Sequence, residues 1–361
     1  MANYQQNYDP FSSSFNMLKL RYASFDEEIV KRNFLCNEDK VNIFINLESV
    51  YTNISTIDHL EEKILVQKDF NILIASYIIN LAAHYKRFFN GMLDVKIYLY
   101  GTNLMSNEFN EYKYNSDFRS YYLLKYNENP KFLNFSERLK FEILPEVTTI
   151  CEFIPRIYVI NTKNIDGGIV PYVIASQDPS RKNFVIGCEQ FETQYSLFNN
   201  FMNIRFLRGG NIRYLAEADD FVNSFLNNKQ DVSSLKIFKH YGIYCGLLSV
   251  LGDRPRSIDG VYGLGPKSYE RMIYKGIANN LITEDTLSGE VLSSIFLDGD
   301  SDEFLNGYYC SNILSMYDLL TDAQKKSILD QIIDRTDINA LNNLNATKYY
   351  THPLMLEGLL L

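Results

Sequence analysis

The sequence has no tryptophan, only four histidines, and five cysteines that never form a Cys-x-x-Cys pair. Structural zinc sites need closely spaced Cys and His ligands, so a zinc-stabilised domain is not indicated. An odd, dispersed set of cysteines is typical of a protein in a reducing compartment rather than of a disulfide framework. The histidines have no Ser or Cys partner pattern, which argues against a hydrolase triad. The cysteines are Cys36, Cys151, Cys188, Cys245 and Cys310.

An excess of positive charge and a long hydrophobic run are also missing. The chain has 35 basic and 44 acidic residues and a net charge of -9. A protein that depends on non-specific attraction to phosphate is usually basic, so any nucleic-acid contact must be local. The longest apolar run, residues 72–83, falls well short of the roughly 20 residues that span a bilayer. The N-terminus also lacks the basic and then apolar pattern of a secretory signal. We therefore expect no membrane partner and a cytoplasmic location, meaning the host cytoplasm or a virion for a viral protein.

What is present is typical of a folded protein with a sizeable core. The 361 residues are 46% hydrophobic and 22% charged, enough for one large domain or two smaller ones. The 27 tyrosines and 24 phenylalanines, together with abundant asparagine, suggest an AT-rich genome, of which a phage is one source. That composition bears on the origin of the chain and not on its function.

Apolar runs of strand-forming residues alternate with stretches of helical spacing. Strands are predicted at 41–47, 94–100, 157–160 and 184–187, and helices at 70–92 and 136–155. This alternation predicts an α/β fold with a mostly parallel sheet. From about residue 232 the pattern becomes helical, and the capping box Thr321–Gln324 predicts a helix that runs to about Arg335. We predict three regions: an N-terminal extension (1–40), an α/β core (41–230) and a helical C-terminal region (231–361).

A glycine-rich segment carries the strongest functional signal. Residues 251–267 read LGDRPRSIDGVYGLGPK, and Gly263-x-Gly265-Pro266-Lys267 predicts a tight turn that opens a helix. Glycines let backbone N–H groups approach a ligand, and the start of a helix favours an anion. The segment is therefore a candidate clamp for a phosphate backbone. A glycine-rich turn between two packed helices is the alternative, and spacing alone does not separate the two.

This segment resembles the helix–three-turn–helix of the 5′-nuclease and flap-endonuclease family, whose pattern is roughly G-D-x-S-D-N-I-P-G-V-x-G-I-G-P-K-T. The matching positions are Gly252, Asp253, Ile258, Gly260, Val261, Gly263, Gly265, Pro266 and Lys267. In the family this segment binds the phosphates of duplex DNA, often with a monovalent cation. The resemblance therefore implies DNA contacts from Gly260, Gly263, Gly265 and Lys267, and a potassium ion beside them.

The resemblance extends upstream and covers residues 41–280 in outline. Residues 41–46 and 95–101 are similar to the family's first two strands, and residues 156–167 to the strand that leads into its acidic E-A-D-D turn, where Asp166 lies. Residues 184–195 are similar to the next strand and its acidic loop. The stretch from Lys113 to Arg119 resembles the Y-K-x-x-R stretch near the arch that handles single strands, which implies single-strand contacts from these two residues. An ordinary Tyr-rich surface loop is the alternative reading of that stretch. The implied fold is a PIN-like, 5′-nuclease-like α/β core with the helix–three-turn–helix segment and a helical C-terminal region.

Most of the carboxylates that the family uses to hold two divalent cations are replaced. Asn46 stands at the position of the family's first-strand Asp, and Gly101 at that of the second-strand Asp. Phe191 replaces one acid of the loop after the strand at 184–187, and Arg256 replaces an acid of the glycine-rich segment with a positive charge. The acids that remain are Asp166, Glu189 and Asp253. Two metals stabilise the attacking and leaving oxygens in phosphodiester hydrolysis, and Mg²⁺ takes oxygen ligands. The resemblance therefore implies no cation or one weakly bound Mg²⁺. Residues 217–220 spell the family's E-A-D-D but lie too close to Asp253, so we interpret them as a solvated helix start.

These observations predict a catalytically impaired flap-endonuclease-like or 5′-3′ exonuclease-like protein. It would bind branched or duplex DNA within a viral replication or virion assembly that includes protein partners. Two alternatives remain open. One is a scaffold without nucleic-acid binding, whose first 40 residues and C-terminal HPLMLEGLLL dock on partner subunits. The other is a weak nuclease that uses Asp166, Glu189 and Asp253 with one metal.

Overall fold

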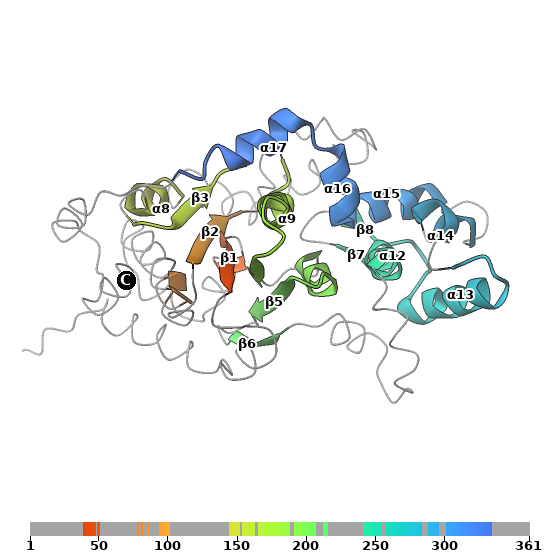
Figure 1. Cartoon of the computed structure of the whole chain (residues 1–361). Helices are drawn as coiled ribbons and strands as arrows, with labels where there is room; N and C mark the ends of the chain where they lie inside the picture. Colours follow the sequence, from red (N-terminus) through yellow and green to blue (C-terminus); the bar gives the residue numbers. More distant parts are fainter. Residues whose placement is uncertain are drawn as a thin grey trace, which may run out of the picture.

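A computed structural model describes the parts of the chain that form a central sheet and two groups of helices (Figure 1). The described residues are 39–47, 49–50, 78, 81–82, 85–86, 94–101, 144–151, 154–162, 165–187, 191–206, 212–215, 241–253, 258–283, 288–295 and 301–333. The strands of the sheet are β1 (Lys40–Asn46), β2 (Asp94–Tyr100), β3 (Ile157–Ile160), β4 (Lys182–Gly187), β5 (Phe201–Phe206) and β6 (Ile212–Leu215). The four predicted strands are confirmed, whereas β5 and β6 were not predicted.

The sheet has the order β3-β2-β1-β4-β5-β6. All neighbours pair in parallel except β5 and β6, which are antiparallel. The expectation of a mostly parallel α/β sheet is therefore confirmed. The chain moves outward from β1 through β2 to β3 and then crosses to β4 on the other side of β1. In such sheets a ligand crevice lies outside the carboxyl ends of the strands where the order reverses, which here is between β1 and β4.

The central strands are buried on both faces, which explains why they read as continuous apolar runs. Ile43 and Phe44 of β1 point to opposite faces and are both fully buried. On one face, an aromatic row crosses three strands: the ring centroids of Phe44 and Tyr98 are 5.0 Å apart, and those of Tyr98 and Tyr158 are 5.1 Å apart. Offset aromatic contacts of this kind add to the burial energy, so they help to hold β1, β2 and β3 in register.

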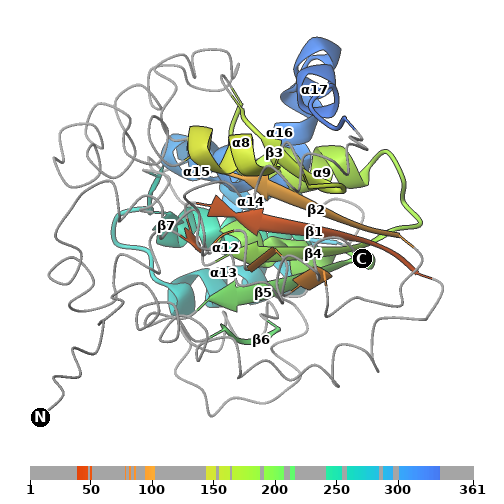
Figure 2. The ribbon, with the colours of Figure 1, turned by 90° about the vertical axis from the view of Figure 1, so that its left-hand side faces the viewer.

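Helices from distant parts of the sequence cover this aromatic face (Figure 2). They are α9 (Val170–Ala175), α16 (Ile313–Leu319) and α17 (Asp322–Leu329). Ile313, Met316 and Ile328 belong to the same buried cluster as the aromatic row. The predicted capping box is confirmed, because Thr321 and Gln324 cap the start of α17 reciprocally. A further helix beside the sheet is α8 (Leu144–Cys151), which lies within the predicted helix 136–155.

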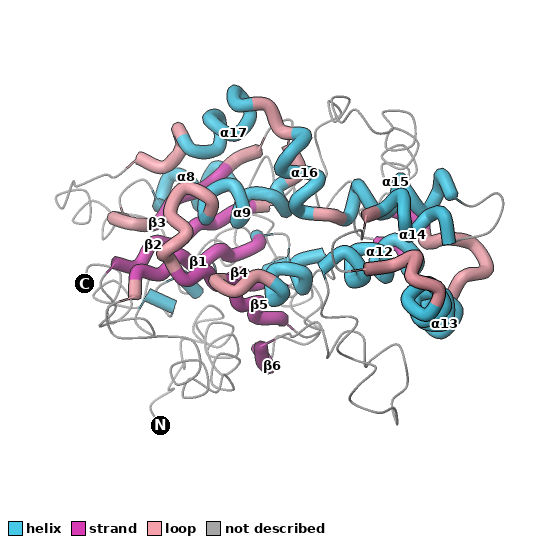
Figure 3. Tube along the Cα trace, turned by 45° about the vertical axis from the view of Figure 1, so that its right-hand side comes forward, coloured by secondary structure: helices cyan, strands magenta, loops and turns pink. Residues whose placement is uncertain are grey.

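A second buried cluster forms among the remaining helices. They are α12 (Tyr241–Leu251), α13 (Pro266–Ala278), α14 (Gly289–Ile295) and α15 (Ser301–Ser311). The cluster includes Tyr244, Tyr269, Leu292 and Phe304. The expected helical C-terminal region therefore contributes to two cores: α12 to α15 build their own, and α16 and α17 return to the sheet. Helix α13 lies at the end of the molecule far from β3 (Figure 3).

Gln194 joins the two cores. It lies in the short 3-10 helix η3 (Phe191–Leu197), which follows β4, and its side chain is fully buried. Its Nε2 donates to the backbone oxygens of Phe191 at 2.8 Å and Ser311 at 2.9 Å. Its Oε1 accepts from the Tyr241 hydroxyl at 2.8 Å and from the Ile313 N–H at 3.0 Å. One amide thus connects the end of the sheet to α12, α15 and α16.

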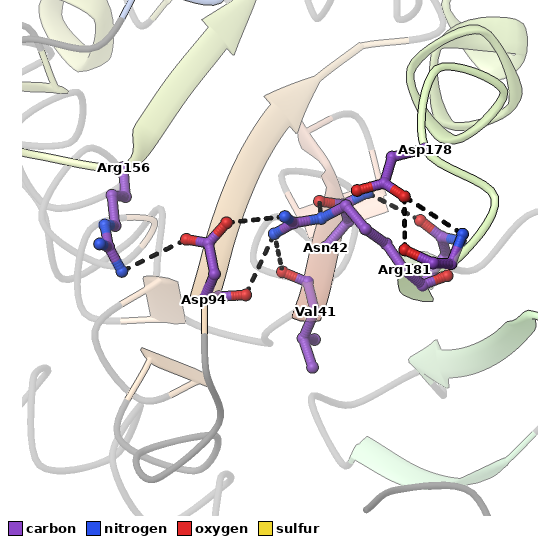
Figure 4. Close-up of polar contacts among 8 residues, drawn as sticks. Val41, Asn42, Asp94, Arg156, Asp178 and Arg181 are labelled. Carbon is purple, nitrogen blue, oxygen red and sulfur yellow. Dashed lines mark hydrogen bonds and ion pairs between the residues drawn. The ribbon is translucent and has the colours of Figure 1, made fainter. Parts of the chain in front are cut away.

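At the amino ends of the strands, an arginine network holds β1, β2 and β4 together (Figure 4). The buried Arg181 donates to Asn42 Oδ1 at 2.7 Å and to Asp94 Oδ2 at 2.7 Å. It also donates to the backbone oxygens of Val41 and Asp94. Arg156 pairs with the other Asp94 oxygen at 3.3 Å. This network lies at the opposite end of the strands from the expected site, so we assign it a structural role.

Two further expectations concern cysteines and membranes. The three cysteines that the structure describes, Cys151, Cys245 and Cys310, are buried free thiols. Within the described ranges, every helix is too short or too polar to cross a bilayer.

Candidate functional site: a strand-end network and a glycine-rich hairpin

Three side chains from separate elements meet at the carboxyl ends of the central strands. Asn46 ends β1, Tyr100 ends β2, and Glu192 lies in η3 just after β4. Asn46 Nδ2 donates to Glu192 Oε1 at 2.7 Å, and the Tyr100 hydroxyl donates to the same oxygen at 2.7 Å. All three residues are fully buried. We call this group the strand-end network.

The orientation of the Asn46 amide is fixed by a second contact. Its Oδ1 accepts a hydrogen bond from the Ser49 N–H at 3.1 Å. A backbone N–H can only donate, so the amide oxygen must face Ser49 and the NH₂ group must face Glu192. The Glu192 carboxylate therefore receives N–H and O–H donors, which is the environment that a buried acid needs to remain stable.

Gly187, the last residue of β4, makes room for the Glu192 carboxylate. A Cβ atom at position 187 would lie 1.8 Å from Glu192 Oε2. Atoms cannot approach that closely, so any side chain at position 187 would displace the carboxylate. Glu192 thus fills the space beside the end of β4, at the point between β1 and β4 where a ligand crevice is expected.

Asp166 lies in the turn after β3, as the sequence predicted, and caps a short helix. Its Oδ1 accepts a hydrogen bond from the Gly168 N–H at 2.9 Å, at the start of the 3-10 helix η2 (Gly167–Ile169), and the residue is 1% exposed. The ring of Phe191 lies against the same glycine, because a Cβ atom at Gly168 would be 2.7 Å from that ring. At the position where the resemblance places an acid, Phe191 therefore contributes packing and no ligand.

The structure tests the predicted acidic trio only in part. Asp166 is described, but Glu189 lies outside the described residues. Asp253 lies in the short strand β7 (Gly252–Asp253), with its side chain outside what the structure describes. Among the residues that are described, no three His, Cys, Asp or Glu side chains gather closely enough to hold a metal ion. Lys113 and Arg119 also lie outside the described residues.

Sequence reasoning missed Glu192 and Tyr100. It assigned the second-strand position to Gly101, one residue after Tyr100, and the loop acid to Glu189, three residues before Glu192. The coiling of η3 is what turns Glu192 back toward the strand ends. An acid set among Phe191, Gln194 and Tyr195 was the only signal in the sequence that this position is buried.

The glycine-rich segment forms a hairpin between α12 and α13. Helix α12 ends at Leu251, and the φ of 74° at the next residue, Gly252, suits a glycine after a helix. The strands β7 and β8 (Ile258–Asp259) then pair antiparallel. A Cβ atom at Gly260 would lie 2.4 Å from the Val250 carbonyl oxygen, and the Val261 N–H donates to that oxygen at 3.1 Å. Gly260 therefore lets the hairpin pack against the end of α12.

The loop from β8 to α13 faces solvent at Tyr262 and Gly263. Tyr262 is 91% exposed, and Gly263 has a φ of 76°, which disfavours other residues there. A Cβ atom at Gly263 or Gly265 would meet nothing within 4 Å. Gly265 is the N-cap of α13 and Pro266 its first residue, with no side-chain cap, and Lys267 is exposed. Pro266 has no N–H, and the N–H groups of Ser268 and Tyr269 donate to the Gly265 backbone oxygen at 3.0 Å, so an anion at this helix start would depend on Lys267.

Comparisons with known proteins identify the fold. No family model matches the sequence, and no curated protein matches it. The T5 D15 protein co-crystallised with metal ions matches with a TM-score of 0.50 at 14% identity, over 81% of this chain and 99% of that chain. The chain therefore has a 5′-nuclease-like, PIN-like α/β fold, as the resemblance implied.

Two further structures give a similar coverage. The T5 5′-exonuclease with bound zinc has a TM-score of 0.47 at 14% identity, over 80% of this chain and 99% of that chain. A bacteriophage T5 flap endonuclease in complex with DNA and metal ions has a TM-score of 0.45 at 15% identity, over 81% of this chain and 98% of that chain.

Proposed function

We propose that this chain is a DNA-binding protein of 5′-nuclease fold in which hydrogen bonds have replaced the cutting centre. The observation that carries this proposal is the strand-end network. In the family that the sequence resembles, the first two strands end in metal-binding carboxylates. Here Asn46 and Tyr100 stand at those strand ends and direct N–H and O–H groups at Glu192 Oε1. A divalent cation at this oxygen would compete with both donors, and neither donor offers a carboxylate in exchange.

The remaining acids support a weak cation site at most. Asp166 already accepts a hydrogen bond from the start of η2, and Phe191 offers no ligand atom. One Mg²⁺ held by Asp166, Glu189 and Asp253 stays a prediction from the sequence. The fold neighbour was crystallised with metal ions, which makes metal binding worth testing in this chain. The donor set of the strand-end network does not fit two metals, so we derive no cleavage step.

DNA binding is supported by the exposed loop between β8 and α13. Gly263 and Gly265 leave open space above the backbone, and Lys267 adds a positive charge at the uncapped start of α13. We propose that this helix–three-turn–helix-like segment binds duplex phosphates, with a potassium ion beside it and with Lys113 and Arg119 near the single strand. A viral replication or virion assembly with further protein subunits is the setting that we propose for branched or duplex DNA.

The test is a labelled flap DNA incubated with the protein in Mg²⁺ or Mn²⁺, with binding and cleavage followed together. We expect binding without cleavage. Lys267→Glu should weaken binding and reduce its salt dependence, because a phosphate contact is lost. Lys326→Glu, an exposed lysine on α17, is the control and should bind like the wild type. Cleavage that Asp166→Ala abolishes would contradict the loss of the cutting centre. A complete lack of binding would instead favour the scaffold.

A further inference from the structure

Strand β3 forms one edge of the sheet, and its neighbour in the sheet is β2. Ile97 of β2 lies opposite Ile157, and its N–H donates to the Arg156 backbone oxygen at 2.9 Å. In a parallel ladder, alternate residues direct both of their backbone groups to the same side. The backbone groups of Tyr158 therefore face β2. Ile157 and Val159 direct their N–H and C=O groups outward, away from the sheet.

The Gln331 side chain shows how a partner can pair with this edge. Asn161 directly follows β3, and its N–H donates to Gln331 Oε1 at 2.8 Å, while its backbone oxygen accepts from Gln331 Nε2 at 3.2 Å. One side-chain amide thus exchanges two hydrogen bonds with one residue, as the facing residue of an antiparallel strand does. Gln331 leaves Ile157 and Val159 uncovered, and neither of their N–H groups has a hydrogen-bond partner within the described part of the chain. Such groups are a template for another chain.

A pocket opens beside this edge, and Figure 1 shows β3 at this end of the sheet with α8 and α17 next to it. Residues of β3, of α8 and of the segment after α17 line the pocket, and they include Thr148, Arg156, Ile157, Val159, Gln331 and Ile333. Ile333 is 55% exposed, so an apolar side chain lies at the rim of the pocket. The pocket therefore combines unpaired backbone groups with an apolar contact, as a site for an extended peptide does.

Arg156 adds an exposed positive charge at the start of β3. Its side chain is 52% exposed, and one guanidinium nitrogen lies 3.3 Å from Asp94 Oδ1. Asp94 has a closer partner in Arg181, at 2.7 Å. A guanidinium has five N–H donors in a planar fork that suits a carboxylate, and most of those of Arg156 have no partner in the described residues. Arg156 can therefore bind an acidic side chain at the end of the pocket.

We propose that the edge of β3 binds an extended peptide of a partner protein as an added antiparallel strand, with an acidic residue of the peptide at Arg156. The peptide exchanges hydrogen bonds with Ile157 and Val159 and continues the pairing that Gln331 makes at Asn161. A second copy of this chain would bring its own Gln331 to the shared edge, so a single extended segment fits better. The inference does not depend on DNA binding, because α13 lies at the end of the molecule far from β3 (Figure 3).

The test is a titration of the isotope-labelled full chain with the capped peptide acetyl-Thr-Val-Thr-Val-Glu-amide, followed by nuclear magnetic resonance. We expect the amide signals of Ile157 and Val159 to shift and their hydrogen exchange to slow as the peptide binds. N-methyl groups on both valines of the peptide remove the N–H groups that face β3 and should abolish binding. The same groups on both threonines, whose N–H groups point away from β3, should leave binding intact.

The role of Arg156 is tested with a matched pair of peptides. Arg156→Gln should weaken binding of the glutamate peptide about fivefold, which is the scale of an exposed ion pair. A peptide with glutamine in place of glutamate should bind the wild type and Arg156→Gln equally. Arg271→Gln, at an exposed position on α13, removes the same charge elsewhere and should bind both peptides like the wild type. Thermal melts that match the wild type will show that Arg156→Gln is folded.

Three results would overturn this inference. The first is an absence of shifts at Ile157 and Val159 with the peptide at millimolar concentration. The second is equal binding by the two N-methylated peptides, which would show that backbone pairing is not involved. The third is a change of the same signals with protein concentration alone, which would show that two copies pair at this edge. A failure of the chain to bind DNA would contradict the proposed function and leave this inference standing.

Discussion

At the scale of single residues, the defining feature is the buried carboxylate of Glu192, which receives hydrogen-bond donors at the carboxyl ends of the central strands. A buried acid destabilises a protein unless its oxygens are paired. Asn46 and Tyr100 provide such pairing for Glu192, and the missing side chain of Gly187 provides the space. These residues depend on one another, so substitutions among them should not have additive effects.

Substituting Gly187 tests this dependence. Gly187→Ala would place a methyl group 1.8 Å from Glu192 Oε2, so we expect it to lower the free energy of unfolding. Overpacking of this kind costs about 1–3 kcal/mol. In a Glu192→Ala background the same change should cost much less, because the clashing carboxylate is gone. Urea unfolding of the four proteins of this cycle measures the coupling. Equal losses in the two backgrounds would show that Glu192 does not occupy the space beside β4.

Asp94 gives the fold a dependence on pH. Burial raises the pKa of Asp94, but the hydrogen bond and charge of Arg181, with the charges of Arg156 and Lys96, outweigh it and hold the pKa below its usual value. A carboxyl whose pKa is lower in the folded state adds stability that is fully present above its unfolded value, about 3.9. That stability is lost as the pH falls through the folded value.

We therefore expect Asp94→Asn to lower the urea midpoint at pH 7 and to approach the wild type below about pH 4. Hydrogen bonds to charged groups contribute about 1.5–3 kcal/mol, which sets the scale of the loss at pH 7. Asp330→Asn, at the exposed end of α17, is the control and should leave the difference from the wild type small at every pH. A constant gap between Asp94→Asn and the wild type from pH 7 to pH 3 would show that the charge of Asp94 is not responsible.

At the scale of elements, the strands were predictable where they are buried on both faces. The predicted bounds of β2 and β3 agree with the structure, and those of β1 differ by one residue at each end. The sequence of β5, FMNIRF, mixes apolar and polar residues and depends on pairing with β4, which no local pattern reveals. The site was predictable only in part. The end of the first strand identified Asn46, but the coiling of η3, which no local pattern reveals, places Glu192 beside it.

The junction between the sheet and the second core gives the prediction at this scale. Gln194→Leu would remove the partners of the Ser311 carbonyl and the Ile313 N–H, which are buried. Each of the two unsatisfied backbone groups costs about 1–3 kcal/mol, so we expect a loss of about 2–6 kcal/mol in the free energy of unfolding. Gln177→Leu, an exposed position after α9, should change stability little.

Calorimetry will measure both variants. If Gln194→Leu unfolds at the wild-type temperature, the amide does not join the two cores. A broadened or split transition would indicate that the cores unfold separately once this joint is removed.

At the scale of the whole molecule, the protein has a net negative charge but carries exposed basic residues on α13. The sheet carries the strand-end network, and the second core carries the hairpin and α13 at the other end (Figure 3). The proposed site for DNA and the strand ends therefore lie in different cores. The sequence signalled the glycine-rich segment by its glycines, but the exposure of Lys267 depends on which side of α13 is packed.

The most direct measurement of the central claim is a Mn²⁺ titration of the wild type and Glu192→Gln, followed by electron paramagnetic resonance. Gln keeps the size of the side chain and removes its charge. We propose that hydrogen-bond donors take the place of metal ligands at Glu192, and this predicts identical Mn²⁺ binding by the two proteins and intact flap DNA with both. A saturable Mn²⁺ site in the wild type that is lost in Glu192→Gln, together with cleavage by the wild type alone, would contradict the claim.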